Sequence, residues 1–101
     1  MSERTTVITI TVTTPRDATD RLTLVVAADY DQAFIDGLKR SVPAYDRAWD
    51  EAATVWRVAP QHLALLQVLA LGFDAAWLIN HDGRRRTDLK TGRAYEQGSL
   101  F

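Results

Sequence analysis

The sequence predicts an α+β fold, with two helices packed on one face of a small sheet of about four strands. Apolar and polar residues alternate in two neighbouring segments near the N-terminus, which predicts a β-hairpin, and two later short segments predict two more strands. Two further segments have apolar residues at helical spacing. The chain has 101 residues and no Cys, so we expect one domain held together by burial rather than by disulfides.

The N-terminal hairpin is predicted from two β-branched, alternating segments. Residues 5–13 read Thr-Thr-Val-Ile-Thr-Ile-Thr-Val-Thr, and residues 21–27 alternate again after turn residues at 15–20. A helix follows, capped by Asp29 or Asp31, and it ends before Pro43 because the residue before a proline is pushed out of the helical region. Its apolar stripe is formed by Tyr30, Phe34, Ile35, Leu38 and Val42.

After Pro43 we expect a short strand or turn at residues 47–49 and a strand at 55–58. Pro60 suits the first position of a second helix that ends near Gly72, and because this helix is apolar on most sides we expect it to be the best-buried element. A last strand is predicted at 75–79. We therefore place the domain over residues 1–82 and a basic, flexible tail over 83–101.

The net charge of −1 is unevenly distributed. Residues 84–101 hold five basic and two acidic groups, about +3, and the remaining 83 residues hold seven basic and eleven acidic groups, about −4.

The start lacks the features of a secretory signal, and no apolar run approaches the roughly 18 residues that would span a bilayer. We expect a cytoplasmic protein with no membrane partner.

The sequence carries no pattern typical of catalysis. His62 and His81 are too few for a metal site, and no glycine-rich loop follows a strand to bind phosphate. Serine is scarce, and no carboxylates are paired in an arrangement suited to acid–base chemistry. We expect a protein that is not an enzyme, with no metal, cofactor or small-molecule substrate.

Two tryptophans with nearby arginines form the first candidate site. Trp49 and Trp56 lie within a dozen residues of Arg47 and Arg57, a combination that stacks bases and neutralises phosphates in single-stranded nucleic acid. The alternative is that both indoles fill the core of a small domain. Both interpretations stay open.

The same region resembles a known family. Phe-Ile-Asp-Gly-Leu-Lys-Arg-Ser-Val-Pro at 34–43, Arg47-x-Trp49-Asp50, Trp56-x-Val58 and a helix from Pro60 resemble the HARP-type module of annealing helicases, over about residues 20–80. Small stand-alone relatives of that module occur in phages and actinobacteria. The resemblance implies an α+β domain that contacts branched or single-stranded DNA, here through Lys39, Arg40, Arg47 and Arg57. The chain has no helicase motor, so its role on DNA would be passive.

The last five residues form the second candidate site. Gln97-Gly98-Ser99-Leu100-Phe101 resembles the bacterial sliding-clamp-binding pentapeptide, Gln-x-Ser/Asp-Leu-Phe, and four of its five positions agree. The resemblance implies that Gln97 enters a polar subsite of the clamp, that Ser99 occupies the Ser/Asp position, and that Leu100 and Phe101 enter a hydrophobic pocket. The alternatives are that Leu100 and Phe101 fold back onto their own domain, or that this end has no function.

The arginine run Arg84, Arg85 and Arg86 has two interpretations: a contact to nucleic acid near the clamp, or a solubilising linker. Taken together, we expect a replication or repair accessory protein, or a phage inhibitory protein, that binds the sliding clamp through its C-terminal pentapeptide with DNA contact by the folded domain. The alternative is a DNA-binding module that uses Trp49 and Trp56 without clamp binding. A third is a homo-oligomer that pairs through an exposed strand edge.

Overall fold

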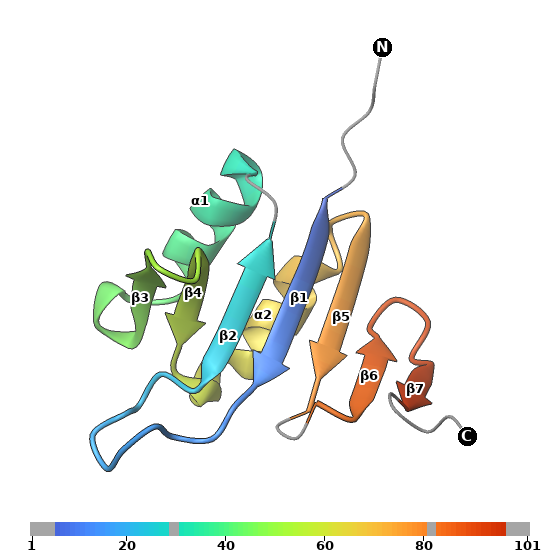
Figure 1. The fold of residues 1–101 in the computed structure, drawn as a ribbon. Coiled ribbons are helices and arrows are strands. Elements are labelled where there is room, and N and C mark those ends of the chain that lie inside the picture. The colour runs from blue at the N-terminus through green and yellow to red at the C-terminus, as the bar shows by residue number, and fades with distance from the viewer. Residues whose placement is uncertain (1–5, 29–30, 81–82, 97–101) are drawn as a thin grey trace.

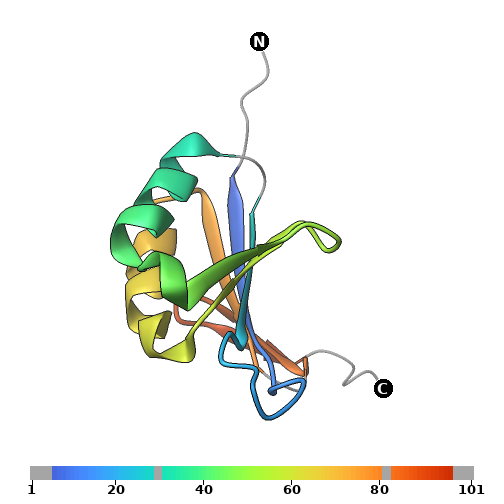
Figure 2. The same ribbon diagram turned by 90° about the vertical axis from the view of Figure 1, so that its left-hand side faces the viewer.

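The computed structural model describes residues 6–28, 31–80 and 83–96. Within these residues it is an α+β fold, a seven-stranded mixed sheet with two helices on one face (Figure 1, Figure 2). The predicted class and the placement of the helices agree with the structure. The prediction of about four strands is wrong, because the sheet is wider at both edges than the alternating apolar segments indicate.

The strands are β1 (Val7–Val12), β2 (Leu24–Ala28), β3 (Arg47–Asp50), β4 (Val55–Val58), β5 (Ala75–Ile79), β6 (Arg85–Asp88) and β7 (Ala94–Glu96). The helices are α1 (Gln32–Ser41) and α2 (Leu63–Ala70), and the chain also forms the short 3₁₀ turns η1 (Ala44–Asp46) and η2 (Pro60–His62). The strand order is β3-β4-β2-β1-β5-β6-β7. β1 and β5 run parallel, and each of the other described neighbours is antiparallel.

The hydrophobic core lies between the sheet and the two helices. Alternate residues of the central strands point toward the helices, and register places Ile10 of β1 between Val26 of β2 and Leu78 of β5. Helix α1 covers them with a stripe of apolar side chains at helical spacing. The buried members of this core are Ile8, Ile10, Leu24, Val26, Phe34, Leu38, Val42, Val58, Leu66, Ala70 and Ala76.

Helix α1 begins and ends as its sequence indicates. The Asp31 carboxylate accepts a hydrogen bond from the Phe34 amide at 3.2 Å, which satisfies one of the free donors at the helix start. Val42 has an extended backbone ahead of Pro43. Gly37 faces α2, where a Cβ would lie 2.6 Å from Leu69 Cδ1, so glycine allows the two helices to approach closely.

Helix α2 is less buried than its apolar sequence predicts. Leu66 and Ala70 face the core, but Leu65, Val68 and Leu71 are exposed. The expectation that this helix is the best-buried element is wrong, because α2 lies in an outer layer and only one of its faces meets the sheet (Figure 2). An apolar sequence on all sides does not require burial on all sides.

Strands β6 and β7 lie in residues predicted to form a flexible tail. β6 pairs with β5, β7 pairs with β6, and the Leu89 amide donates to the Ala76 carbonyl at 2.9 Å. Leu89 packs against the core. The sheet therefore extends to Glu96, and the predicted boundary at residue 82 falls between β5 and β6.

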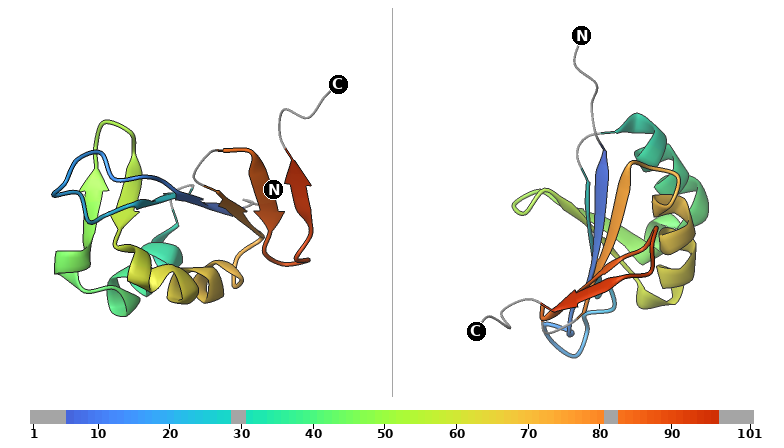
Figure 3. Two further views of the ribbon diagram at one scale, coloured as in Figure 1. Left: turned by 90° about the horizontal axis from the view of Figure 1, so that it is seen from below. Right: turned by 90° about the vertical axis from the view of Figure 1, so that its right-hand side faces the viewer.

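The second face of the sheet is covered by no helix in the described part of the chain, and we call it the open face. The β3–β4 hairpin projects toward this side, whereas the turn of the β6–β7 hairpin lies on the side of the helices (Figure 3). The floor of the open face is uncharged and partly exposed, and it is formed by Thr9, Thr11, Val25, Ala27, Trp77 and Ile79.

Candidate nucleic-acid interface

Two aromatic residues and one arginine gather on the open face, one from each of the strands β5, β6 and β7. Register places Arg86 directly opposite Tyr95 and next to Ile79, so all three point to the same side of the sheet. Trp77, two residues before Ile79, shares this side. The Arg86 guanidinium carbon lies 3.9 Å from the centre of the Trp77 ring, and the centres of the Trp77 and Tyr95 rings are 6.1 Å apart.

This aromatic–arginine cluster is accessible. Tyr95 is 45% exposed, and Trp77 and Arg86 are partly exposed. Among the described residues, the Arg86 guanidinium makes no hydrogen bond or ion pair, so its N–H donors are available to a ligand. The positive charge of a guanidinium above an indole is stabilised by the negative electrostatic potential of the ring face.

The hairpin that carries the cluster is strongly basic. Residues 83–96 contain five basic and two acidic residues, a formal charge of +3. Four of the five basic side chains are exposed, and Arg86 is partly buried against Trp77. The basic members are Arg84, Arg85, Arg86, Lys90 and Arg93. Two members of the arginine run predicted to lie in a flexible tail, Arg85 and Arg86, therefore belong to a paired strand, and Arg86 lies beside the aromatic rings.

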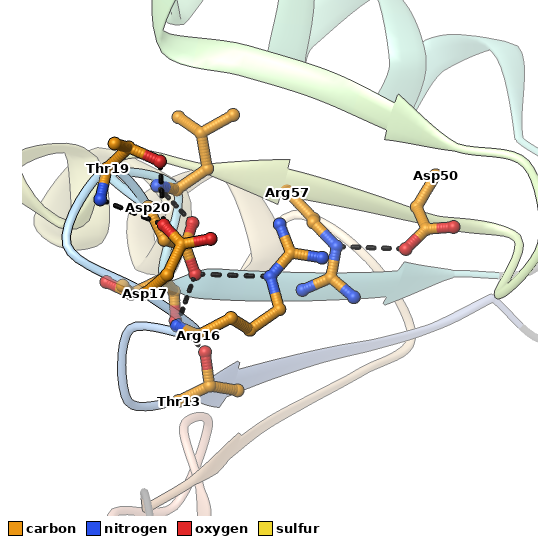
Figure 4. A network of polar contacts seen from close by, with 9 residues as sticks. Thr13, Arg16, Asp17, Thr19, Asp20, Asp50 and Arg57 are labelled. Carbon is orange, nitrogen blue, oxygen red and sulfur yellow. Dashed lines mark hydrogen bonds and ion pairs between the residues drawn. The ribbon is translucent and has the colours of Figure 1, made fainter.

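At the opposite end of the open face, the arginines are paired with aspartates. Arg57 pairs with Asp50 at 2.9 Å and Arg16 with Asp20 at 3.2 Å, as Figure 4 shows. The pKa of Asp50 is lowered chiefly by the hydrogen bond from the Ala53 amide and then by Arg57. Each of these two arginines already has a carboxylate partner, so this end attracts a polyanion less than the β6–β7 hairpin does.

Trp49 and Trp56, the tryptophans singled out by the sequence, do lie side by side. Their rings meet edge to face with centres 5.4 Å apart, and they border a cavity of about 320 Å³ next to Phe34 and Ile35. The Lys39 ammonium is 6.0 Å from the Trp56 ring centre. Trp56 packs against the core and Trp49 is 46% exposed, so the core-filling interpretation applies to Trp56.

The arginines predicted to accompany these tryptophans do not join them. The Arg47 guanidinium donates to the Val42 carbonyl, at the C-terminal end of α1, and Arg57 lies on the open face. Arg40 is exposed in the last turn of α1. The predicted contact set is thus divided between two faces of the sheet and one helix end.

A buried carboxylate, that of Asp46, contacts three polar side chains. Asp46 is buried, and its carboxylate contacts His62 Nε2 at 2.8 Å, Gln61 Nε2 at 3.3 Å and an Arg21 guanidinium nitrogen at 3.3 Å. The hydrogen bond with His62 is the main reason why the pKa of Asp46 is lowered. This network joins η1, η2 and the β1–β2 loop, which is a structural role.

Two residues of the aromatic–arginine cluster, Trp77 and Tyr95, are absent from the sequence-based candidates. The sequence does hold one signal for the β6–β7 hairpin, the Thr91-Gly92 pair in the turn between these strands. Glycine favours such turns because it adopts a positive φ easily, and Gly92 has φ +77°. The predicted clamp-binding residues Gln97, Ser99, Leu100 and Phe101 lie outside the described residues, as does His81.

The described residues contain no group of three or more His, Asp or Glu side chains placed to hold a metal ion. None of their helices is long and apolar enough to cross a membrane. No protein-family model, curated protein or solved structure matches the chain. The resemblances to the HARP-type module and to the clamp-binding pentapeptide therefore stay predictions from the sequence.

Proposed function

We propose that this chain is a non-enzymatic, cytoplasmic protein that binds single-stranded DNA on its open face. The observation that supports this most is the cluster of Trp77, Arg86 and Tyr95, in which Arg86 and Tyr95 belong to a hairpin of formal charge +3. Aromatic side chains stack unpaired bases, and basic side chains release counterions from the phosphates. In the described part of the chain no helix covers the floor of the open face, which leaves room for a strand to lie across the sheet.

Single-stranded rather than duplex DNA fits this surface. An aromatic ring on a sheet offers its face to a base, and the faces of paired bases are already stacked within the duplex. The uncharged floor, with Thr9, Val25 and Ile79, suits bases better than phosphates. The charged groups that would meet phosphates lie at the rim, on the β6–β7 hairpin.

Tyr95→Ala tests this function, because Tyr95 is exposed and its removal leaves the core intact. Binding of a labelled single-stranded oligonucleotide, followed by fluorescence anisotropy at low salt, should weaken about 5- to 150-fold, as expected when one base loses its stacking partner. Tyr45→Ala is the matched control, because Tyr45 is 74% exposed and belongs to η1 rather than to a strand of the sheet. Equal affinity of the two variants would reject the proposed surface.

Salt dependence gives a second measure of the same site. Lys90→Ala and Arg93→Ala remove exposed charges of the hairpin, and removal of one phosphate-binding charge should reduce the slope of log affinity against log salt by about 0.7. Arg40→Ala, on α1, is the control and should leave the slope unchanged. If all of these variants have the same slope of log affinity against log salt, the DNA phosphates bind to another surface.

Attachment to the bacterial sliding clamp is a second candidate function, supported by the sequence match of residues 97–101. β7 ends at Glu96, so this pentapeptide would follow directly on the proposed DNA-binding hairpin. Burial of Leu100 and Phe101 contributes roughly 1.5–3 kcal/mol each. Ordering a flexible peptide costs about 1–2 kcal/mol per residue, so a simultaneous DNA contact would strengthen a weak attachment. Recruitment to DNA and competition with other clamp ligands both use this contact.

Clamp binding is tested with purified clamp on a sensor surface. The triple variant Gln97→Ala, Leu100→Ala, Phe101→Ala should lose clamp binding and keep its affinity for single-stranded DNA without clamp. Tyr95→Ala should show the reverse. If wild type and the triple variant bind the clamp equally, or if neither binds, the pentapeptide has another role.

A further inference from the structure

Arg86 is held in a way that suits recognition of a base rather than only of a phosphate. Its guanidinium carbon lies 3.9 Å from the centre of the Trp77 ring, which is van der Waals contact. A guanidinium has five N–H donors in one plane, and stacking on an aromatic ring limits the orientations of that plane. A lysine ammonium in the same place would carry the positive charge but would lack the planar set of N–H donors.

The donors of Arg86 are not occupied by a neighbouring carboxylate. Asp88 is the nearest acidic residue on the same side of β6, and its carboxylate accepts the Lys90 amide at 2.9 Å. Within the described residues, the guanidinium has no hydrogen-bond or ion-pair partner. A ligand at this site therefore meets a preorganised pair of free donors.

Tyr95 determines where a stacked base would lie. It faces Arg86 directly across the β6–β7 ladder, and side chains in such pairs have Cβ atoms about 4.5–5.5 Å apart. A base stacked on the exposed Tyr95 ring would have one edge beside the Arg86 donors. Guanine carries two adjacent acceptors, O6 and N7, on the edge that arginine binds with two hydrogen bonds, whereas adenine has one acceptor and one donor there.

The geometry points to a guanine-preferring subsite in which Tyr95 stacks the base and Arg86 donates to O6 and N7. This specificity rests on the proposed function, since it requires single-stranded nucleic acid on the open face. The shared chemistry is an unpaired guanine, in DNA or in RNA. Trp77 acts as a positioning residue, because it holds Arg86 and need not touch the base.

Anisotropy titrations with short oligo-dT, and with the same oligonucleotide carrying one central dG, dA or 7-deaza-dG, test the subsite. A single guanine avoids self-association of guanine-rich strands. We expect dG to bind about 5- to 150-fold tighter than oligo-dT. The 7-deaza analogue lacks N7 and should lose most of this advantage, and dA should gain little. An RNA oligonucleotide with one guanine should show the same preference if the base alone is recognised.

Arg86→Lys keeps the charge and removes the planar fork, so it should abolish the preference for dG over oligo-dT. Arg85→Lys is the matched control, because Arg85 is exposed on the other side of β6, and it should keep the preference. Thermal unfolding of both variants checks that the hairpin remains folded.

The outcomes distinguish the preference for guanine from the single-stranded DNA binding on which it depends. Wild-type protein that binds dG and dT oligonucleotides equally, or Arg86→Lys that keeps the full preference, overturns the guanine subsite and leaves DNA binding in place. A wild-type protein that binds none of the oligonucleotides at low salt overturns both. A preference seen in RNA and not in DNA would assign recognition to the sugar and would also overturn it.

Discussion

The substitution Leu89→Ala measures whether the β6–β7 hairpin is part of the folded domain. Leu89 follows β6, its side chain packs against the core, and its amide donates to Ala76 in β5 at 2.9 Å. Truncation of a fully buried leucine to alanine costs about 2–5 kcal/mol. Leu89 is partly buried at the sheet's periphery, so we expect a decrease of about 1–2 kcal/mol in the free energy of unfolding.

Circular dichroism during heating and urea titration measures this decrease. For a domain of this size, each kcal/mol lowers the melting temperature by about 4–8 °C. The adjacent Lys90 is exposed, and Lys90→Ala should change stability by less than about 0.5 kcal/mol. If Leu89→Ala melts within about 1 °C of wild type, residues 83–96 contribute nothing to the fold, and the proposed site on them loses its scaffold.

Three further substitutions test the remaining parts of the structure. Hydrogen bonds to Asp46 lower its pKa below the ordinary value of 3.8, so its contribution to stability is present above pH 3.8 and is lost as the pH falls through the lower folded-state pKa. In urea titrations, the stability difference between wild type and Asp46→Asn should therefore narrow below pH 3.8, and a constant difference would contradict this linkage. Thr54 has φ +54°, where a side chain is strained, so Thr54→Gly should raise the urea midpoint by the equivalent of about 0.5–1 kcal/mol at unchanged m-value; a lower midpoint would argue against the strain. Phe34 is fully buried with its ring edge to face with Phe73, and Phe34→Ala should cost about 3–5 kcal/mol in chemical denaturation; a cost under about 1 kcal/mol would exclude it from the core.

The central elements were predictable because their residues carry strong local signals. β1 alternates between Thr and Ile or Val, and α1 has a capping aspartate and a terminating proline. β6 carries no such signal: Arg85-Arg86-Thr87-Asp88 shows no apolar alternation, because a peripheral strand buries little of its side chains. Its placement depends on pairing with β5, which is a tertiary contact.

The candidate site was less predictable than the fold for the same reason. Arg86 was named from the sequence, but the ring beneath it comes from β5 and the tyrosine beside it from β7. Trp49 and Trp56 lie side by side because they belong to the β3–β4 hairpin, whereas the sequence leaves open whether they stack bases or fill the core. Arg57 follows Trp56 directly in β4, so strand alternation places it on the other face of the sheet, in agreement with the register of β4 with β2.

The parallel pair of β1 and β5 joins segments that are far apart along the chain. The Thr6 amide next to β1 donates to Asp74, 68 residues later, just before β5. During synthesis, β1 can pair with β2 early, but its other edge stays unpaired until β5 leaves the ribosome. At about 5–20 residues per second, making the chain from Ala28 to Ala75 takes roughly 2–10 s. A nascent chain stalled in that interval exposes a β-branched edge in the middle of its future sheet, which is where misassembly between ribosome-bound copies would begin.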